Sequence, residues 1–155
     1  MTTLPATTAT RPRVVIAPGN GCANINSANW YRWAAELLES SGWCSEVVCR
    51  AFPDPHRARE KKWLPFLKEE CACDENTVLI GHSSGAVAAM RLLETTQLRG
   101  CILVSACWTD LGDSGERAAG YYNRKWKWEK IRANADWIVQ FHSADDPFIP
   151  PEESR

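Results

Sequence analysis

The stretch TVLIGHSSGAVAAM, residues 77–90, limits the folds open to this chain more than any other feature. Its apolar, partly β-branched start is typical of a buried strand, and its small-residue end favours a helix. The Gly-His-Ser-Ser-Gly turn between them matches G-x-S-x-G, which presents a serine at a sharp strand-to-helix bend. Ser83 is therefore the candidate nucleophile. Gly81 and Gly85 have no Cβ atoms that would block close approach of the helix to the strand.

Apolar runs alternate with helical patterns along the rest of the chain. Because these runs are continuously apolar, they predict an α/β fold with a mostly parallel sheet and helices on both faces. The carboxyl ends of such strands form one edge, where sites usually lie. The predicted strands are 14–17, 46–52, 77–80, 100–105 and 137–141, and the predicted helices are 30–40, 58–70 with a kink or break at Pro65, 84–94 and 116–133.

Length and composition indicate one domain. The chain has 155 residues, of which 45% are hydrophobic, and a formal net charge of -1. We expect residues 1–12 to be a flexible tail and residues 13–155 to be a single domain. Basic residues are spread out and no apolar run approaches membrane-spanning length, so neither nucleic acid nor a membrane is expected as a partner.

The seven cysteines are irregularly spaced, and their pattern matches no zinc site. We therefore predict neither a metal nor another cofactor. Reduced thiols are the simplest account of an odd number of cysteines, which favours a cytoplasmic or nuclear location.

Two further elements of a serine site follow other strands. The amide of Ser84 opens the helix after the nucleophile and would face an oxyanion. The PGNG loop, residues 18–21, could supply a second donor through the amides of Asn20 or Gly21, although a plain tight turn explains that loop equally well.

The candidate acid is Asp146, in DDPFIP after the last predicted strand. The order serine, then acid, fits the α/β-hydrolase arrangement. Asp146 is preferred to Asp145 because Pro147 fixes the chain directly after it. A turn-forming Asp-Pro pair is the alternative interpretation of this loop.

Taken together, these motifs resemble the retinoblastoma-binding protein 9 family of small α/β-hydrolase serine hydrolases. The stretches that carry the resemblance are PGNG, WLPF, IGHSSGAVAAMR, LVSA, DLGD, WKWEKI, IVQF and DDPFIP, in that order from residue 18 to residue 150. The resemblance implies hydrolysis of small esters or amides, with Ser83 as nucleophile and Asp146 as the acid of a Ser-His-Asp triad. It also implies the retinoblastoma protein as a partner, through a Leu-x-Cys-x-Glu motif. Here Cys71 stands in place of the Leu in Cys71-Ala-Cys-Asp-Glu75, which weakens that expectation.

The base is the missing member of the triad. The resemblance implies a histidine well downstream of the acid, yet only nine residues follow Asp146 and none is histidine. His82 precedes the nucleophile, His56 follows a Pro-Asp-Pro turn, and His142 ends a strand near the acid loop. We expect none of the three to replace the base, and we interpret the chain as a shortened form lacking the final strand and helix.

Two expectations follow from this interpretation. Strand 137–141 would become an exposed apolar edge prone to self-association. The chain would be a serine hydrolase without its base or, alternatively, a catalytically impaired interaction protein of the retinoblastoma-binding type.

Trp126 and Trp128, in the segment 116–133, either line an acyl pocket or simply pack that segment onto the sheet.

Overall fold

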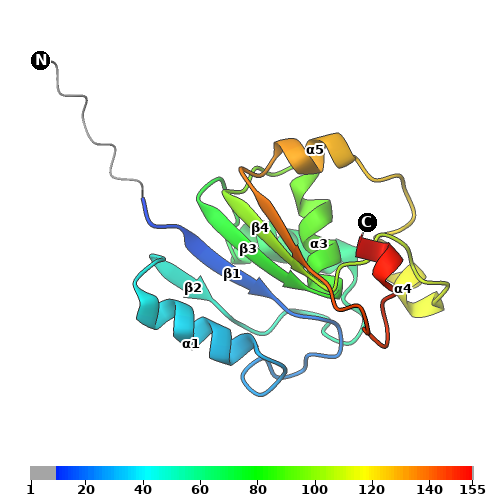
Figure 1. Cartoon of the computed structure of the whole chain (residues 1–155), viewed down its shortest axis with the longest axis horizontal. Helices are drawn as coiled ribbons and strands as arrows, with labels where there is room; N and C mark the ends of the chain where they lie inside the picture. The colour runs from blue at the N-terminus through cyan, green and yellow to red at the C-terminus, as the bar shows by residue number, and fades with distance from the viewer. Residues whose placement is uncertain (1–9, 155) are drawn as a thin grey trace, which may run out of the picture.

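The computed structural model describes residues 10–154, which form a five-stranded parallel sheet with helices on both faces (Figure 1). The strand order is β2-β1-β3-β4-β5. The strands are β1 (Arg13–Ala17), β2 (Glu46–Val48), β3 (Thr77–His82), β4 (Gly100–Val104) and β5 (Ile138–Phe141). The helices are α1 (Tyr31–Ser41), α2 (Glu60–Pro65), α3 (Ser84–Leu93), α4 (Ser114–Ala119) and α5 (Trp128–Ala133), with a π-helix η1 (Phe66–Glu70) and a 3-10 helix η2 (Pro151–Ser154).

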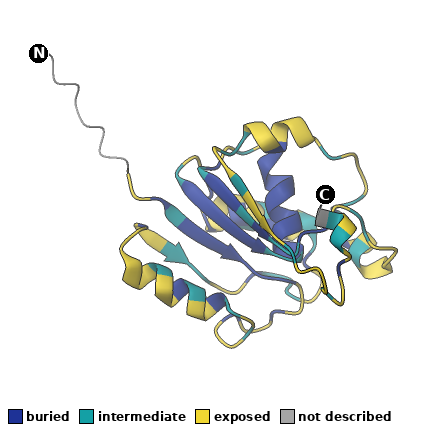
Figure 2. Ribbon diagram, viewed as in Figure 1, coloured by how far each residue is buried: buried dark blue, intermediate teal, exposed yellow. Residues whose placement is uncertain are grey.

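The core divides into two clusters, one on each face of the sheet. Val14 and Ile16 of β1 pack toward α1, whereas Val15 and Ala17 face the cluster that contains α3 and residues of α2, η1 and α5. The central strands are therefore buried on both faces (Figure 2), which explains why their sequences are continuously apolar. This confirms the predicted fold class.

Three predicted elements differ from the structure. The second strand ends at Val48 rather than Phe52. At Pro65, where the sequence predicts a kink or break, the α-helix α2 ends and the chain continues directly into η1 with wider turns, as in the bond from the Cys71 amide to the Phe66 carbonyl. The predicted helix 116–133 is instead two short helices, α4 and α5, joined by a non-helical segment after Gly120, whose φ of 98° ends α4.

The predicted tail lies mostly outside the described residues, which begin at residue 10. Residues 10–12 of that predicted tail contact the body of the fold. The carbonyl of Thr10 accepts from Arg99, that of Arg11 from Asn76, and that of Pro12 from the Ser45 amide.

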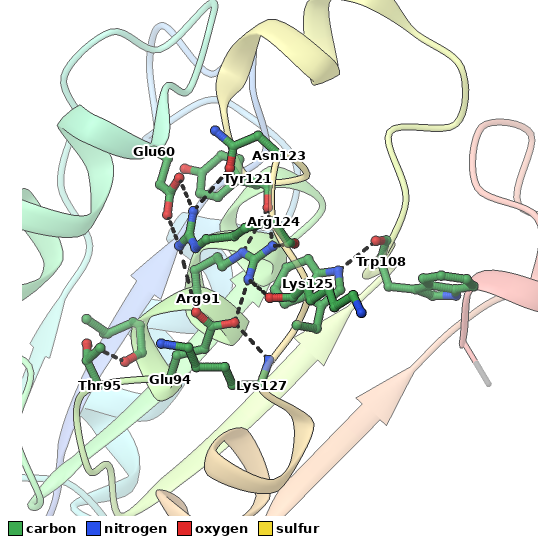
Figure 3. Close-up of polar contacts among 12 residues, drawn as sticks. Glu60, Arg91, Glu94, Thr95, Trp108, Tyr121, Asn123, Arg124, Lys125 and Lys127 are labelled. Carbon is green, nitrogen blue, oxygen red and sulfur yellow. Dashed lines mark hydrogen bonds and ion pairs between the residues drawn. The ribbon is translucent and has the colours of Figure 1, made fainter.

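A buried arginine holds the non-helical segment 120–127 in place (Figure 3). The Arg91 side chain, near the end of α3, is 0% exposed and pairs with Glu94, which is 3% exposed. Its guanidinium also stacks on Trp126, 3.5 Å from the ring centroid. Its remaining N–H groups donate to the main-chain carbonyls of Tyr121, Arg124 and Lys125. One side chain thus satisfies three carbonyls that no helix satisfies.

Replacing Arg91 with Met should destabilise the protein by about 3–5 kcal/mol, because the buried Glu94 would lose its buried partner and keep only Arg124, 3.7 Å away, for an ion pair. Urea unfolding measures this loss. Arg32→Met is the matched control, since Arg32 pairs with Glu36 on the exposed face of α1 and its loss should cost far less. Equal losses for the two variants would contradict the role given to Arg91.

Strand β5 lies at one edge of the sheet and is exposed, as predicted. Among the described residues it pairs with β4 alone. Val139 is 42% exposed and Phe141 is 57% exposed. An exposed apolar edge strand is a template for pairing with another chain.

Val139→Lys should therefore reduce concentration-dependent self-association, measured by size-exclusion chromatography. Leu37→Lys changes a side chain that is 55% exposed on α1, away from any strand edge, and should leave association unchanged. A wild-type protein that elutes as a monomer at every concentration would refute the prediction.

Candidate active site

Ser83 occupies a strained bend between β3 and α3. Its φ of 52° and ψ of -120° lie in a region that residues other than glycine rarely adopt. The bend is held by the Ser83 amide, which donates to the Val104 carbonyl at 2.9 Å. The following helix begins at Ser84, so its first amides point toward the serine.

Glycine is required on both sides of this bend. A Cβ atom on Gly85 would lie 2.2 Å from the carbonyl oxygen of Ala17, and one on Gly81 would lie 2.5 Å from the carbonyl oxygen of Gly85. These contacts are to main-chain atoms, which cannot rotate away. The two glycines therefore let α3 lie against β1 and β3 closely enough to form the bend.

Gly85→Ala should cost more than about 3 kcal/mol of stability, since the added methyl overlaps the main chain of β1. Gly112→Ala is the control, because Gly112 has a φ of 76° but open space around it, so that only the backbone strain of about 1–2 kcal/mol applies. Thermal unfolding of both variants tests this, and an equal effect would show that the close approach is not needed.

Ser83 and Asp146 line the same cavity, whose volume is about 330 Å³. Ser84, Asn20 and Glu116 also line it, so the three loops that follow β1, β3 and β5 meet there. A larger cavity of about 700 Å³ lies between α2 and α4 and contains none of the predicted site residues.

Asp146 is held by hydrogen bonds to both carboxylate oxygens. Oδ1 accepts from the amides of Phe148 and Ile149, each at 3.0 Å, and Oδ2 accepts from Ser105 Oγ at 2.9 Å. Burial alone would raise the Asp146 pKa, but these bonds outweigh it and hold the pKa below its ordinary value. Asp146 is thus an ionised, oriented carboxylate. The neighbouring Asp145 is exposed and accepts from Ser143.

The hydrogen bonds of the PGNG loop decide which amides are free to bind an oxyanion. The Gly21 amide donates to the Pro55 carbonyl at 2.7 Å, and the Gly19 amide donates to Tyr31 Oη at 2.9 Å. The prediction of Gly21 as an oxyanion donor is therefore wrong for this conformation, because its N–H is occupied. The amides of Asn20 and Ser84 have no acceptor among residues 10–154 and remain the candidate donors.

Sequence reasoning missed two side chains of this cavity that hydrogen-bond to predicted site residues. Glu116 Oε1 accepts from Asn20 Nδ2 at 3.0 Å, and burial, followed by the charge of Asp113, raises the Glu116 pKa. Ser105, with a φ of 48°, orients Asp146. Glu116 resembles an ordinary helix-start glutamate in the sequence, whereas the place of Ser105 directly after a parallel strand was a usable signal.

No histidine nitrogen within residues 10–154 is hydrogen-bonded to Ser83. His82 Nδ1 lies 2.7 Å from Tyr31 Oη, and His142 Nε2 donates to the Ile149 carbonyl at 3.1 Å. His56 is exposed and does not line the Ser83 cavity. That none of the three replaces the base stays a prediction.

The tryptophans of the segment 116–133 lie outside the Ser83 cavity. Trp126 stacks on Trp128 and donates to the Trp108 carbonyl, and Trp128 lines a separate groove of about 470 Å³ beside β5. This arrangement favours packing over an acyl pocket as their role.

The Cys71–Glu75 segment does not present its cysteines on the surface. Cys71 is 1% exposed and Cys73 is 5% exposed, and burial raises the pKa of the Cys71 thiol to about 11. All seven cysteines are free thiols. Residues 10–154 contain no cluster of three or more His, Cys, Asp or Glu side chains that could hold a metal ion. No helix in that range combines the length and apolar character needed to cross a membrane.

Comparison with known proteins identifies the family. The family model for serine hydrolases matches residues 14–155. The chain belongs to the serine hydrolase family. It is 51% identical over 144 residues to serine hydrolase RBBP9 of Rattus norvegicus, an alignment that covers 92% of this chain and 76% of the relative. The resemblance to the retinoblastoma-binding protein 9 family is therefore confirmed.

Solved structures place the serine hydrolase chain among α/β-hydrolases. The crystal structure of the ydeN gene product of Bacillus subtilis matches with a TM-score of 0.77 and 28% identity, over 92% of this chain and 77% of that one. A lipase/esterase from Lactobacillus plantarum matches with a TM-score of 0.58 at 15% identity, over 99% and 74% of the two chains, and supports the fold alone.

Proposed function

We propose that this chain carries the acylation site of a hydrolase for small ester or amide substrates. Ser83 is the nucleophile, the amides of Asn20 and Ser84 stabilise the oxyanion, and Asp146 is the acid that orients and charge-stabilises a base. The observation that carries the proposal is that Ser83, with its strained backbone, and the hydrogen-bonded carboxylate of Asp146 line the same cavity. Its modest volume of about 330 Å³ suits a small acyl group.

We further propose that the three histidines of this sequence do not supply the base. His82 contacts Tyr31 through Nδ1, His142 donates to the Ile149 carbonyl through Nε2, and His56 lies away from the cavity. Without a base, Ser83 is a weak nucleophile, and its reaction should be slower by several orders of magnitude than in a complete triad. The free thiols support a reducing compartment such as the cytoplasm or nucleus.

A fluorophosphonate probe tests both parts of this proposal. Wild-type protein should label slowly at Ser83, and added imidazole should accelerate labelling, because the cavity beside Asp146 can take a free base. Ser83→Ala should abolish labelling. Asp146→Asn should keep slow labelling but lose the acceleration, since the imidazole would no longer be oriented.

Labelling that persists in Ser83→Ala would refute the nucleophile. Fast wild-type labelling that is indifferent to imidazole would show that the chain already holds its base. Absence of labelling, with partner binding that depends on Val139 and Phe141 of the exposed β5 edge, would favour the alternative of an interaction protein.

A further inference from the structure

The hydroxyl of Tyr31 joins the two loops that flank Ser83. Tyr31 is the first residue of α1 and is 0% exposed. Its Oη accepts from the Gly19 amide at 2.9 Å and lies 2.7 Å from His82 Nδ1. A Cβ atom on Gly19 would lie 3.3 Å from Ser83 Cβ, so the main chain at this junction lies directly beside Ser83.

The position of one proton follows from these contacts. The phenol oxygen accepts from the Gly19 amide, and the Asn29 side chain also donates toward it, as its lowering effect on the Tyr31 pKa indicates. With both acceptor positions of the oxygen taken, the tyrosine O–H is assigned as the donor to His82 Nδ1. Nδ1 is then an acceptor, and the proton of a neutral His82 sits on Nε2. Burial raises the Tyr31 pKa despite the opposing Gly19 bond, so the phenol keeps its proton. Burial also lowers the His82 pKa, although Asp146 opposes this, so the imidazole stays neutral near pH 7.

The other ring nitrogen is not enclosed by the fold. Nε2 of His82 has no hydrogen-bond partner among residues 10–154, yet it is not among their buried, unpaired atoms. His82 and Ser83 both line the cavity that contains Asp146. Both also line a second cavity of about 250 Å³ beside the PGNG loop.

We propose that Tyr31 is a positioning residue that fixes His82 in the Nε2–H tautomer, so that His82 presents a neutral hydrogen-bond donor beside Ser83 rather than a base. A donor of this kind suits an uncharged oxygen acceptor, such as the carbonyl or ether oxygen of a substrate next to the scissile bond. The substrate role rests on the proposed function, whereas the tautomer does not.

Nitrogen NMR of protein carrying ¹⁵N-labelled histidine tests the tautomer directly, with His82→Gln used to assign the signals. In wild type, His82 Nδ1 should be unprotonated and Nε2 protonated. Tyr31→Phe should convert this to a mixture of tautomers and speed exchange of the Gly19 amide by roughly fivefold or more, the worth of one hydrogen bond. Tyr121→Phe is the matched control, because Tyr121 is also 0% exposed but its hydroxyl has no partner in the described residues.

A protonated Nδ1 in wild type, or a His82 spectrum unchanged by Tyr31→Phe, would overturn the proposal. Labelling with fluorophosphonate supplies the second measurement. His82→Gln retains an N–H donor and should label within about threefold of wild type, whereas His82→Leu should label at least tenfold more slowly. If labelling slows equally in His82→Gln and His82→Leu, the result would instead indicate that His82 acts as a base. If wild-type protein does not label at all, the proposed function fails. The NMR signals of the His82 ring nitrogens then still determine the tautomer.

Discussion

Close contact between helix α3 and the strands beneath it is the constraint on which the site depends. The absence of side chains at Gly81 and Gly85 allows main-chain atoms of α3 to lie against β1 and β3 at distances that a Cβ atom would not permit. That approach forces the bend at Ser83 and points the first amides of α3 toward the serine. At the far end of the same helix, Arg91 anchors the segment 120–127. One helix therefore positions Ser83 at its first end and the segment 120–127 at its other end.

Competition for hydrogen bonds then selects the chemistry of the cavity. The PGNG loop has several amides near Ser83, but Tyr31 takes that of Gly19 and Pro55 takes that of Gly21. The Asn20 amide has no acceptor within the described range 10–154, while its side chain donates to Glu116. On the opposite side, three donors converge on Asp146 and keep it ionised. Donors are thus free where an oxyanion would form, and a carboxylate is fixed where a base would need orientation.

Features set by local sequence were predictable, and features set by distant contacts were not. Continuous apolar runs gave the strands and the sheet type, and the G-x-S-x-G spacing gave the bend at Ser83. The prediction of one helix over 116–133 was wrong because hydrogen bonds from Arg91, about thirty residues earlier in the chain, hold the main chain in its middle in a non-helical conformation. The prediction of Gly21 as an oxyanion donor failed because its amide donates to the carbonyl of Pro55, which belongs to another loop. In the sequence, Tyr31 is recognisable only as part of a predicted helix, because the neighbouring residues do not indicate that its hydroxyl reaches His82.

The central claim is that Ser83 forms an acyl-enzyme, and mass spectrometry after incubation with p-nitrophenyl acetate tests it most directly. Deacylation also needs a base, so the acetyl group should accumulate on the peptide that contains Ser83, and imidazole should shorten its lifetime. Acetylation confined to lysine or cysteine side chains, or an adduct that forms equally in Ser83→Ala, would contradict the account.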